Sequence, residues 1–82
     1  MNEMELKGQL KEIIAEIIEV DEFGDDENFV RDLGVDSMMA LEIVARIEKS
    51  YRIRIPEEFL PEIKTLTDVT RVVSNVMQPI NG

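Results

Sequence analysis

The chain has 82 residues, no cysteine, no histidine and a formal net charge of −9. This length allows one small domain, so we expect residues 1–82 to form a single domain around one core. The missing cysteines exclude disulfides, and the missing histidines remove the commonest general base and metal ligand. The negative charge disfavours binding to nucleic acid. With no apolar run long enough to cross a membrane and no signal-peptide pattern, we expect a soluble, cytoplasmic monomer.

The negative charge is unevenly distributed along the chain. Residues 1–36 contain 12 acidic and 3 basic side chains, whereas residues 37–82 contain 6 of each. The chain is therefore an acidic half followed by an electrically balanced half.

The segment from about Glu3 to Val20 is predicted to be the first helix. Its leucines and isoleucines recur at helical spacing and form one apolar stripe, which we assign to the core. Asn2 followed by Glu5 is typical of an N-terminal cap. The residues of the stripe are Leu6, Leu10, Ile13, Ile14, Ile17 and Ile18.

Residues 21–36 are predicted to be a long connection. Its acidic residues do not match the spacing of an EF-hand calcium loop, so a solvated acidic loop is the better interpretation. Phe29 and Leu33 are the apolar residues expected to anchor this loop to the core.

The second helix is predicted to run from about Ser37 to Tyr51. Helical spacing places five residues on one face that should be buried. Met38, Met39 and Ala45 lie nearer the polar face and Leu41 at its margin, so these apolar side chains are candidates for contact with a partner. The five residues expected to be buried are Ala40, Ile43, Val44, Ile47 and Tyr51.

The C-terminal third is predicted to contain one short helical turn and one further helix. The turn is expected at Pro56–Pro61, because proline fits its first position and a second proline limits its length. Thr65 is expected to start the last helix, with Asp68 completing a capping box. The fold class is therefore all-α, a bundle of three main helices and one short helix with a long first loop.

Ser37 has two compatible interpretations. Serine is among the preferred N-cap residues of a helix. A helix N-terminus also favours an anion, such as a phosphate ester on this hydroxyl. Asp36 could supply the cap and leave Ser37 free.

The sequence Asp32-Leu33-Gly34-Val35-Asp36-Ser37-Met38 resembles the phosphopantetheine attachment motif of acyl carrier proteins. Further residues fall at spacings similar to those of the family, so the resemblance covers nearly the whole chain. It implies a four-helix bundle of the acyl carrier protein type. The further residues are Phe29, Leu41, Glu42, Val44, Ile47, Glu48, Tyr51, Ile55, Pro56, Ile63, Leu66 and Val69.

This resemblance implies a non-catalytic carrier. A phosphopantetheinyl transferase would attach 4′-phosphopantetheine from coenzyme A to Ser37, with Asp36 contributing to recognition. The thiol of the arm would then hold acyl groups as thioesters and deliver them to acyl-loading and acyl-processing enzymes of fatty-acid, lipid or polyketide-type synthesis. The alternatives are an aminoacyl, peptidyl or D-alanyl carrier, or an unmodified helical interaction module.

The family also implies a docking surface on the second helix. Met38, Met39, Leu41 and Ala45, with Glu42 and Glu48, are the residues expected to contact partner enzymes. The family often has an acid two positions after the serine, where this chain has Met39. Arg46, Lys49, Arg52 and Arg54 make the surface mixed in charge, which predicts a specialised carrier with dedicated partners.

Overall fold

The computed structural model describes residues 2–77, and its regular elements in this range are all helical. In chain order they are α1 (Glu3–Ile18), α2 (Ser37–Tyr51), the 3₁₀-helix η1 (Glu57–Glu62) and α3 (Leu66–Met77). The predicted all-α bundle of three main helices and one short helix is confirmed. The bounds predicted for the second helix coincide with those of α2.

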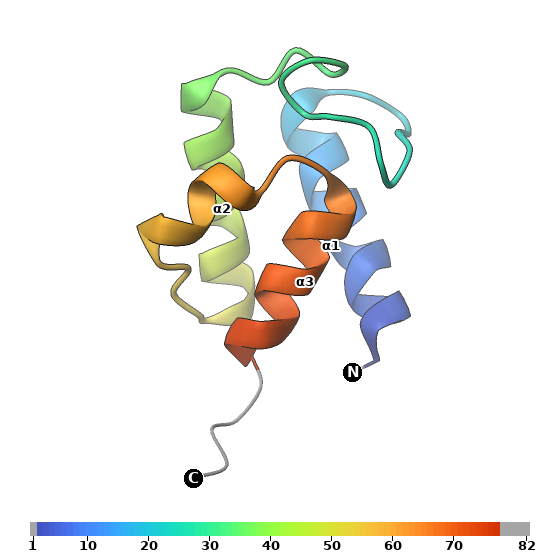
Figure 1. Ribbon diagram of the computed structural model, residues 1–82. Helices are drawn as coiled ribbons and strands as arrows, with labels where there is room; N and C mark the ends of the chain where they lie inside the picture. Colours follow the sequence, from blue (N-terminus) through green and yellow to red (C-terminus); the bar gives the residue numbers. More distant parts are fainter. Residues whose placement is uncertain (1, 78–82) are drawn as a thin grey trace, which may run out of the picture.

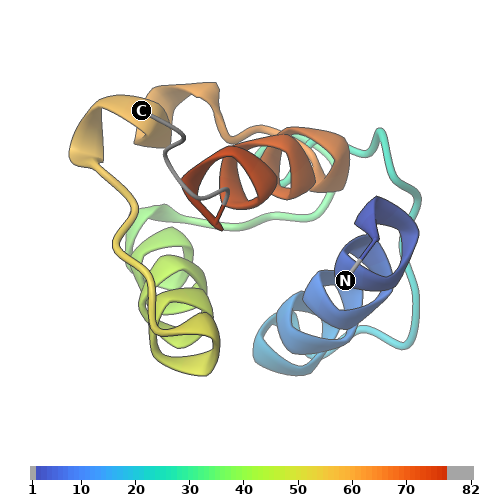
Figure 2. The ribbon, with the colours of Figure 1, turned by 90° about the horizontal axis from the view of Figure 1, so that it is seen from below.

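Helix α1 packs against both α2 and α3 (Figures 1 and 2). The connection between α2 and α3 contains η1, which lies beside α2 at the front of the view in Figure 1. One continuous apolar core fills the space between the elements. Its fully buried large side chains are Leu10, Ile14, Ile47, Leu66, Val69 and Val73.

Three side-chain caps set where the main helices begin. The amide N–H of Glu5 donates to the side-chain oxygen of Asn2 at 2.8 Å, as predicted for α1. Thr65 and Asp68 form the predicted capping box before α3, each side chain accepting the other residue's backbone N–H at 3.2 Å. At α2 the cap is Asp36, whose carboxylate accepts the N–H of Met39 at 2.9 Å. Of the two possible caps for α2, the structure therefore uses the aspartate.

Two aromatic side chains fasten the long connection between α1 and α2 to the core. Phe23 and Phe29 are buried and meet edge to face, with ring centroids 6.1 Å apart. The Phe29 N–H donates to the carbonyl of Lys64 at 2.9 Å, which ties the loop to the segment before α3. The Lys7 ammonium donates to Asp25 at 2.8 Å, and this hydrogen bond holds the pKa of Asp25 below its usual value. Phe23 and Asp25 thus fix the first half of the acidic loop, and Phe29 fixes the second half.

Two expectations about the helices need correction. Helix α1 ends at Ile18 rather than near Val20, because Glu19 adopts the left-handed conformation (φ 59°) and closes the last turn with its N–H on the Ala15 carbonyl. Ala40 is exposed, although Ile43 and Ile47 on the same predicted face are buried. Ala40 instead lines a cleft between α2 and η1.

Replacing Asp36 tests its role as the cap of α2. Asp36→Ala leaves an N–H of the first turn without its partner, and we expect it to lower the free energy of unfolding by about 1 kcal/mol. Asp36→Asn is the matched control, because asparagine caps as well as aspartate and should restore most of the loss. Urea unfolding of the three proteins measures the difference. An equal loss in both variants would show that charge rather than capping is what matters.

Candidate functional site

Ser37 is the first residue of α2, and its side chain is exposed. Its hydroxyl has no hydrogen-bond partner within residues 2–77, because the carboxylate of Asp36 already accepts the amide of the first turn. An exposed hydroxyl that caps nothing can be esterified without breaking a structural hydrogen bond. The positive end of α2 also favours a negatively charged substituent at this position.

A tight turn at residues 28–34 precedes Asp36 and Ser37 and directs the chain to the start of α2. The side-chain oxygen of Asn28 accepts the N–H groups of Val30 and Arg31, at 3.0 and 2.8 Å. The Asn28 N–H in turn donates to Asp32 at 2.8 Å, and this bond holds the pKa of the Asp32 carboxyl below its usual value. Gly34 then adopts a positive φ of 69°, a conformation that glycine tolerates best. The turn fixes Asp36 and Ser37 at the start of α2.

An apolar cleft of about 360 Å³ opens beside Ser37. It lies between α2, the preceding loop and η1 with the residues that follow it, and Ser37 is its one polar lining residue. Such a volume is at the lower end of the range for ligand pockets. The other lining residues are Phe29, Val30, Val35, Ala40, Leu41, Ile43, Val44, Leu60, Pro61 and Ile63.

A second hollow, also of about 360 Å³, overlaps the cleft. The two share Val30, Ser37, Ala40, Leu60, Pro61 and Ile63. The residues that line only the second hollow are polar: Asn28, Asp36 and Lys64. Ser37 therefore lies where the apolar cleft meets three polar residues.

Four residues of the docking surface predicted on α2 are exposed in the structure. Met38 and Leu41 are exposed by 80% and 58%, which is unusual for large apolar side chains. Ala45 and Glu42 are exposed as well. Sequence analysis missed Val30, which is 69% exposed and borders the cleft from the loop side.

Two residues of the predicted docking surface have structural roles instead of full exposure. Met39 was expected near the polar face, but it is half-buried and packs against the core. The Glu48 carboxylate accepts the N–H of Ile55 at 2.8 Å, which fixes the chain where it leaves α2. Their contact with partners stays a prediction, and the structure gives Met38, Leu41, Glu42 and Ala45 the greater exposure.

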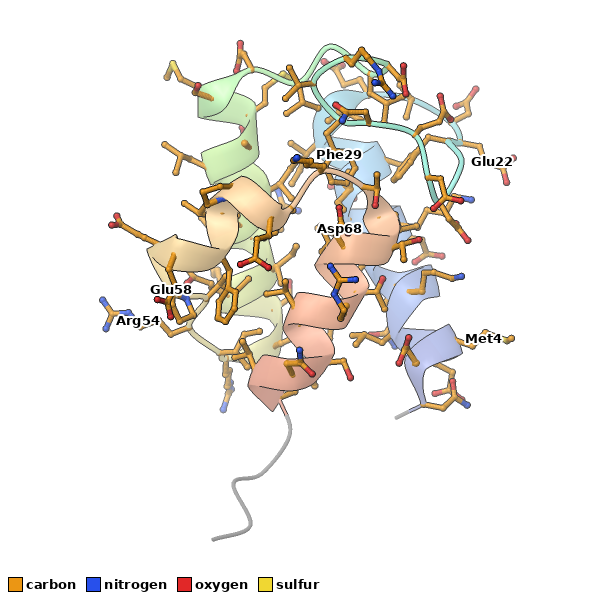
Figure 3. All side chains as sticks on the ribbon, in the orientation of Figure 1. Met4, Glu22, Phe29, Arg54, Glu58 and Asp68 are labelled. Atoms are coloured by element: carbon orange, nitrogen blue, oxygen red, sulfur yellow. The ribbon has the colours of Figure 1, made fainter. Side chains whose placement is uncertain are left out.

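Three basic side chains lie in the last turn of α2 and just after the helix. Lys49, Arg52 and Arg54 are exposed and make no ion pair within residues 2–77. In Figure 3, Arg54 projects outward on the opposite side of the molecule from Glu22 of the acidic loop.

Across residues 2–77, no group of three or more acidic side chains is arranged to hold a metal ion. Within the same range, none of the helices is both long and apolar enough to span a membrane.

Comparisons with known proteins agree with this geometry. The model of the phosphopantetheine attachment site family matches residues 8–73. Polyketide-8 synthase acyl carrier protein 2 of Streptomyces avermitilis is 47% identical over 62 residues, which cover 73% of this chain and 71% of that protein.

Solved structures show the same fold. BlmI, a type-II acyl carrier protein from Streptomyces verticillus involved in bleomycin biosynthesis, aligns with a TM-score of 0.83 and 26% identity. The alignment covers 93% of this chain and 90% of BlmI. An active-site mutant of a peptidyl carrier protein aligns with a TM-score of 0.79 over 100% of this chain and 89% of its own, at 19% identity, so the fold alone does not identify the cargo. The family match, the sequence relatives and the fold together place this chain in the acyl carrier protein family, whose members carry a phosphopantetheine attachment site.

Proposed function

We propose that Ser37 is the residue that receives 4′-phosphopantetheine, and that the chain carries acyl groups for the enzymes of fatty-acid, lipid or polyketide-type synthesis. The observation that carries this proposal is the uncommitted hydroxyl of Ser37, which is free because Asp36 caps α2 in its place. Ser37 also lines both the apolar cleft and the second hollow that overlaps it, so a substituent there can enter this space.

The chain's own residues supply position rather than catalysis. With no histidine and no cysteine, the sequence has no side-chain imidazole or thiol for acyl transfer. The arm, when bound, supplies a thiol that holds the acyl group as a thioester. The transferase that attaches the arm is expected to recognise Asp36, the acidic residue next to the modified hydroxyl. We therefore propose a non-catalytic carrier whose reactions occur on partner enzymes.

The apolar cleft favours an acyl cargo over an aminoacyl or peptidyl one. Apart from Ser37, its lining residues are all hydrocarbon side chains or proline. A hydrocarbon chain gains about 0.8 kcal/mol for each methylene that leaves water. An aminoacyl group carries an ammonium that would lose hydration there without gaining a hydrogen-bond partner. The cleft therefore supports an acyl chain folded back from Ser37.

The mixed charge of the α2 region supports dedicated partners. The exposed end of the helix near Ser37 is apolar at Met38 and Leu41, and the opposite end is basic at Lys49 and Arg52. Complementary charges guide which partner docks and how fast it associates. We propose a specialised carrier rather than the general carrier of fatty-acid synthesis.

Intact mass spectrometry after incubation with coenzyme A and a broad-specificity phosphopantetheinyl transferase tests the attachment site. We expect the wild-type protein to gain one phosphopantetheine and Ser37→Ala to gain none. Ser50→Ala is the matched control, because Ser50 is an exposed serine at the other end of α2, and it should be modified like the wild type. Modification that persists in Ser37→Ala would move the site elsewhere.

Narrowing the cleft tests the acyl cargo. Ala40→Phe places a ring on the lining of the cleft, whereas Ala45→Phe adds the same ring on the same helix outside it. Displacing two methylene groups from the cleft removes about 1.6 kcal/mol of hydrophobic stabilisation, which lowers the population of the buried chain about fifteenfold. We expect thioester cleavage by hydroxylamine in the octanoyl-loaded protein to be faster in Ala40→Phe than in Ala45→Phe. Equal rates would mean that the chain stays in water.

A purified ketoacyl synthase of general fatty-acid synthesis tests the dedicated partners. We expect its kcat/KM with this carrier, loaded with the same acyl group, to be lower than with its own carrier, because the basic end of α2 changes the docking surface. The measurement is the initial rate at several carrier concentrations. Equal values of kcat/KM would show that the charge pattern does not restrict partner choice.

A further inference from the structure

We propose that Lys64 binds the phosphate that links the arm to Ser37. This inference rests on the proposed attachment at Ser37 and adds a residue that the attachment motif does not contain. Lys64 lies in the segment between η1 and α3, 27 residues after the serine in the chain. The fold brings it to the second hollow, which Ser37 and Asp36 also line.

The backbone of Lys64 is held on both sides, so its side chain starts from a fixed point. Its carbonyl accepts the N–H of Phe29 at 2.9 Å, and its own N–H donates to Asp68 at 3.1 Å. The ammonium itself makes no ion pair within residues 2–77, and Asp68 is paired with Arg71 at 3.2 Å. A flexible four-carbon stem then lets this uncommitted cation reach a phosphate in the hollow.

The charges around Ser37 explain why a cation is needed there. A phosphodiester on Ser37 would place a negative charge directly beside the carboxylate of Asp36. The N-terminal dipole of α2 offsets only part of this repulsion, because the carboxylate already accepts the Met39 amide. In the adjoining turn, Arg31 lies 3.5 Å from Asp32 and is paired with it. Lys64 is the cationic residue among those that line the hollow.

Phosphoserine incorporated at position 37 tests this contact without any transferase. Its second pKa is about 6 in the absence of neighbours, and a nearby cation lowers it by favouring the dianion. Titration followed by ³¹P NMR should give a value about half a pH unit higher in Lys64→Met than with lysine present. Lys64→Arg should keep the low value, because it keeps the charge.

Lys49→Met is the matched control, since it removes the same charge from an exposed site. Lys49 is about 18 Å from Ser37 along α2, which exceeds the Debye length of about 8 Å at physiological ionic strength. It should therefore leave the phosphoserine pKa at the wild-type value. Equal pKa values in Lys64→Met and Lys49→Met would overturn the proposal.

The phosphopantetheine-loaded protein provides the second measurement. The ³¹P chemical shift of its phosphodiester should differ between the folded protein and the same protein unfolded in urea. Lys64→Met should remove most of this difference in chemical shift, whereas Lys49→Met should retain it. A resonance that is the same in both variants would contradict the contact. If the arm does not attach to Ser37, mass spectrometry of the protein will show it, and that result would contradict the proposed function. The phosphoserine titration needs no arm, so it would still decide the role of Lys64.

Discussion

The carboxylate of Asp36 accepts the N–H of Met39 at 2.9 Å, and the candidate site depends on this one hydrogen bond. A helix needs its first amides satisfied, and serine commonly provides the acceptor. Here the preceding aspartate provides it, so the hydroxyl of Ser37 remains exposed and without a partner in the described part of the chain. The same arrangement places an acidic side chain next to the hydroxyl. On the proposed function, one residue therefore caps the helix, frees the modified atom and marks it for the transferase.

A second constraint holds the surroundings of that hydroxyl in place. The Phe29 N–H bonds to the Lys64 carbonyl at 2.9 Å, and the buried Phe29 ring anchors the loop on the core. This contact joins the loop before α2 to the segment before α3. The apolar cleft and the hollow that overlaps it both lie between these segments and the first turns of α2. The packing of the bundle thus places apolar residues and the polar residues Asn28, Asp36 and Lys64 around Ser37.

Local sequence signals predicted the elements of this fold well. The capping pairs at Asn2 and Thr65 lie where the pattern placed them. Helical periodicity also identified the four buried residues of α1. The end of α1 was predicted less well. The helix is capped by Glu19, which adopts a left-handed conformation, whereas the residues that usually mark such an end in a sequence are glycine and asparagine. Periodicity also made Ala40 a core residue, since it reports the face of a helix and not how far the neighbouring elements extend.

The lining of the site was less predictable than its motif. Ser37 and Asp36 follow from a local pattern, whereas Leu60, Ile63 and Lys64 reach the site only through the way η1 and the following segment pack beside α2. No spacing within the sequence encodes that approach. Met39 illustrates the same limit, because its position on the helix suggested solvent while the core in fact covers part of it.

The most direct measurement of the central claim is peptide mapping of the protein isolated from its own cells. Trypsin releases residues 32–46 as one peptide, in which Ser37 is the only hydroxyl-bearing residue. We predict that mass spectrometry finds this peptide carrying phosphopantetheine, with an acyl group on its terminal sulfur. A peptide 32–46 that is always unmodified, or a phosphopantetheine arm found on another peptide, would contradict the claim that this helix presents Ser37 as the attachment point.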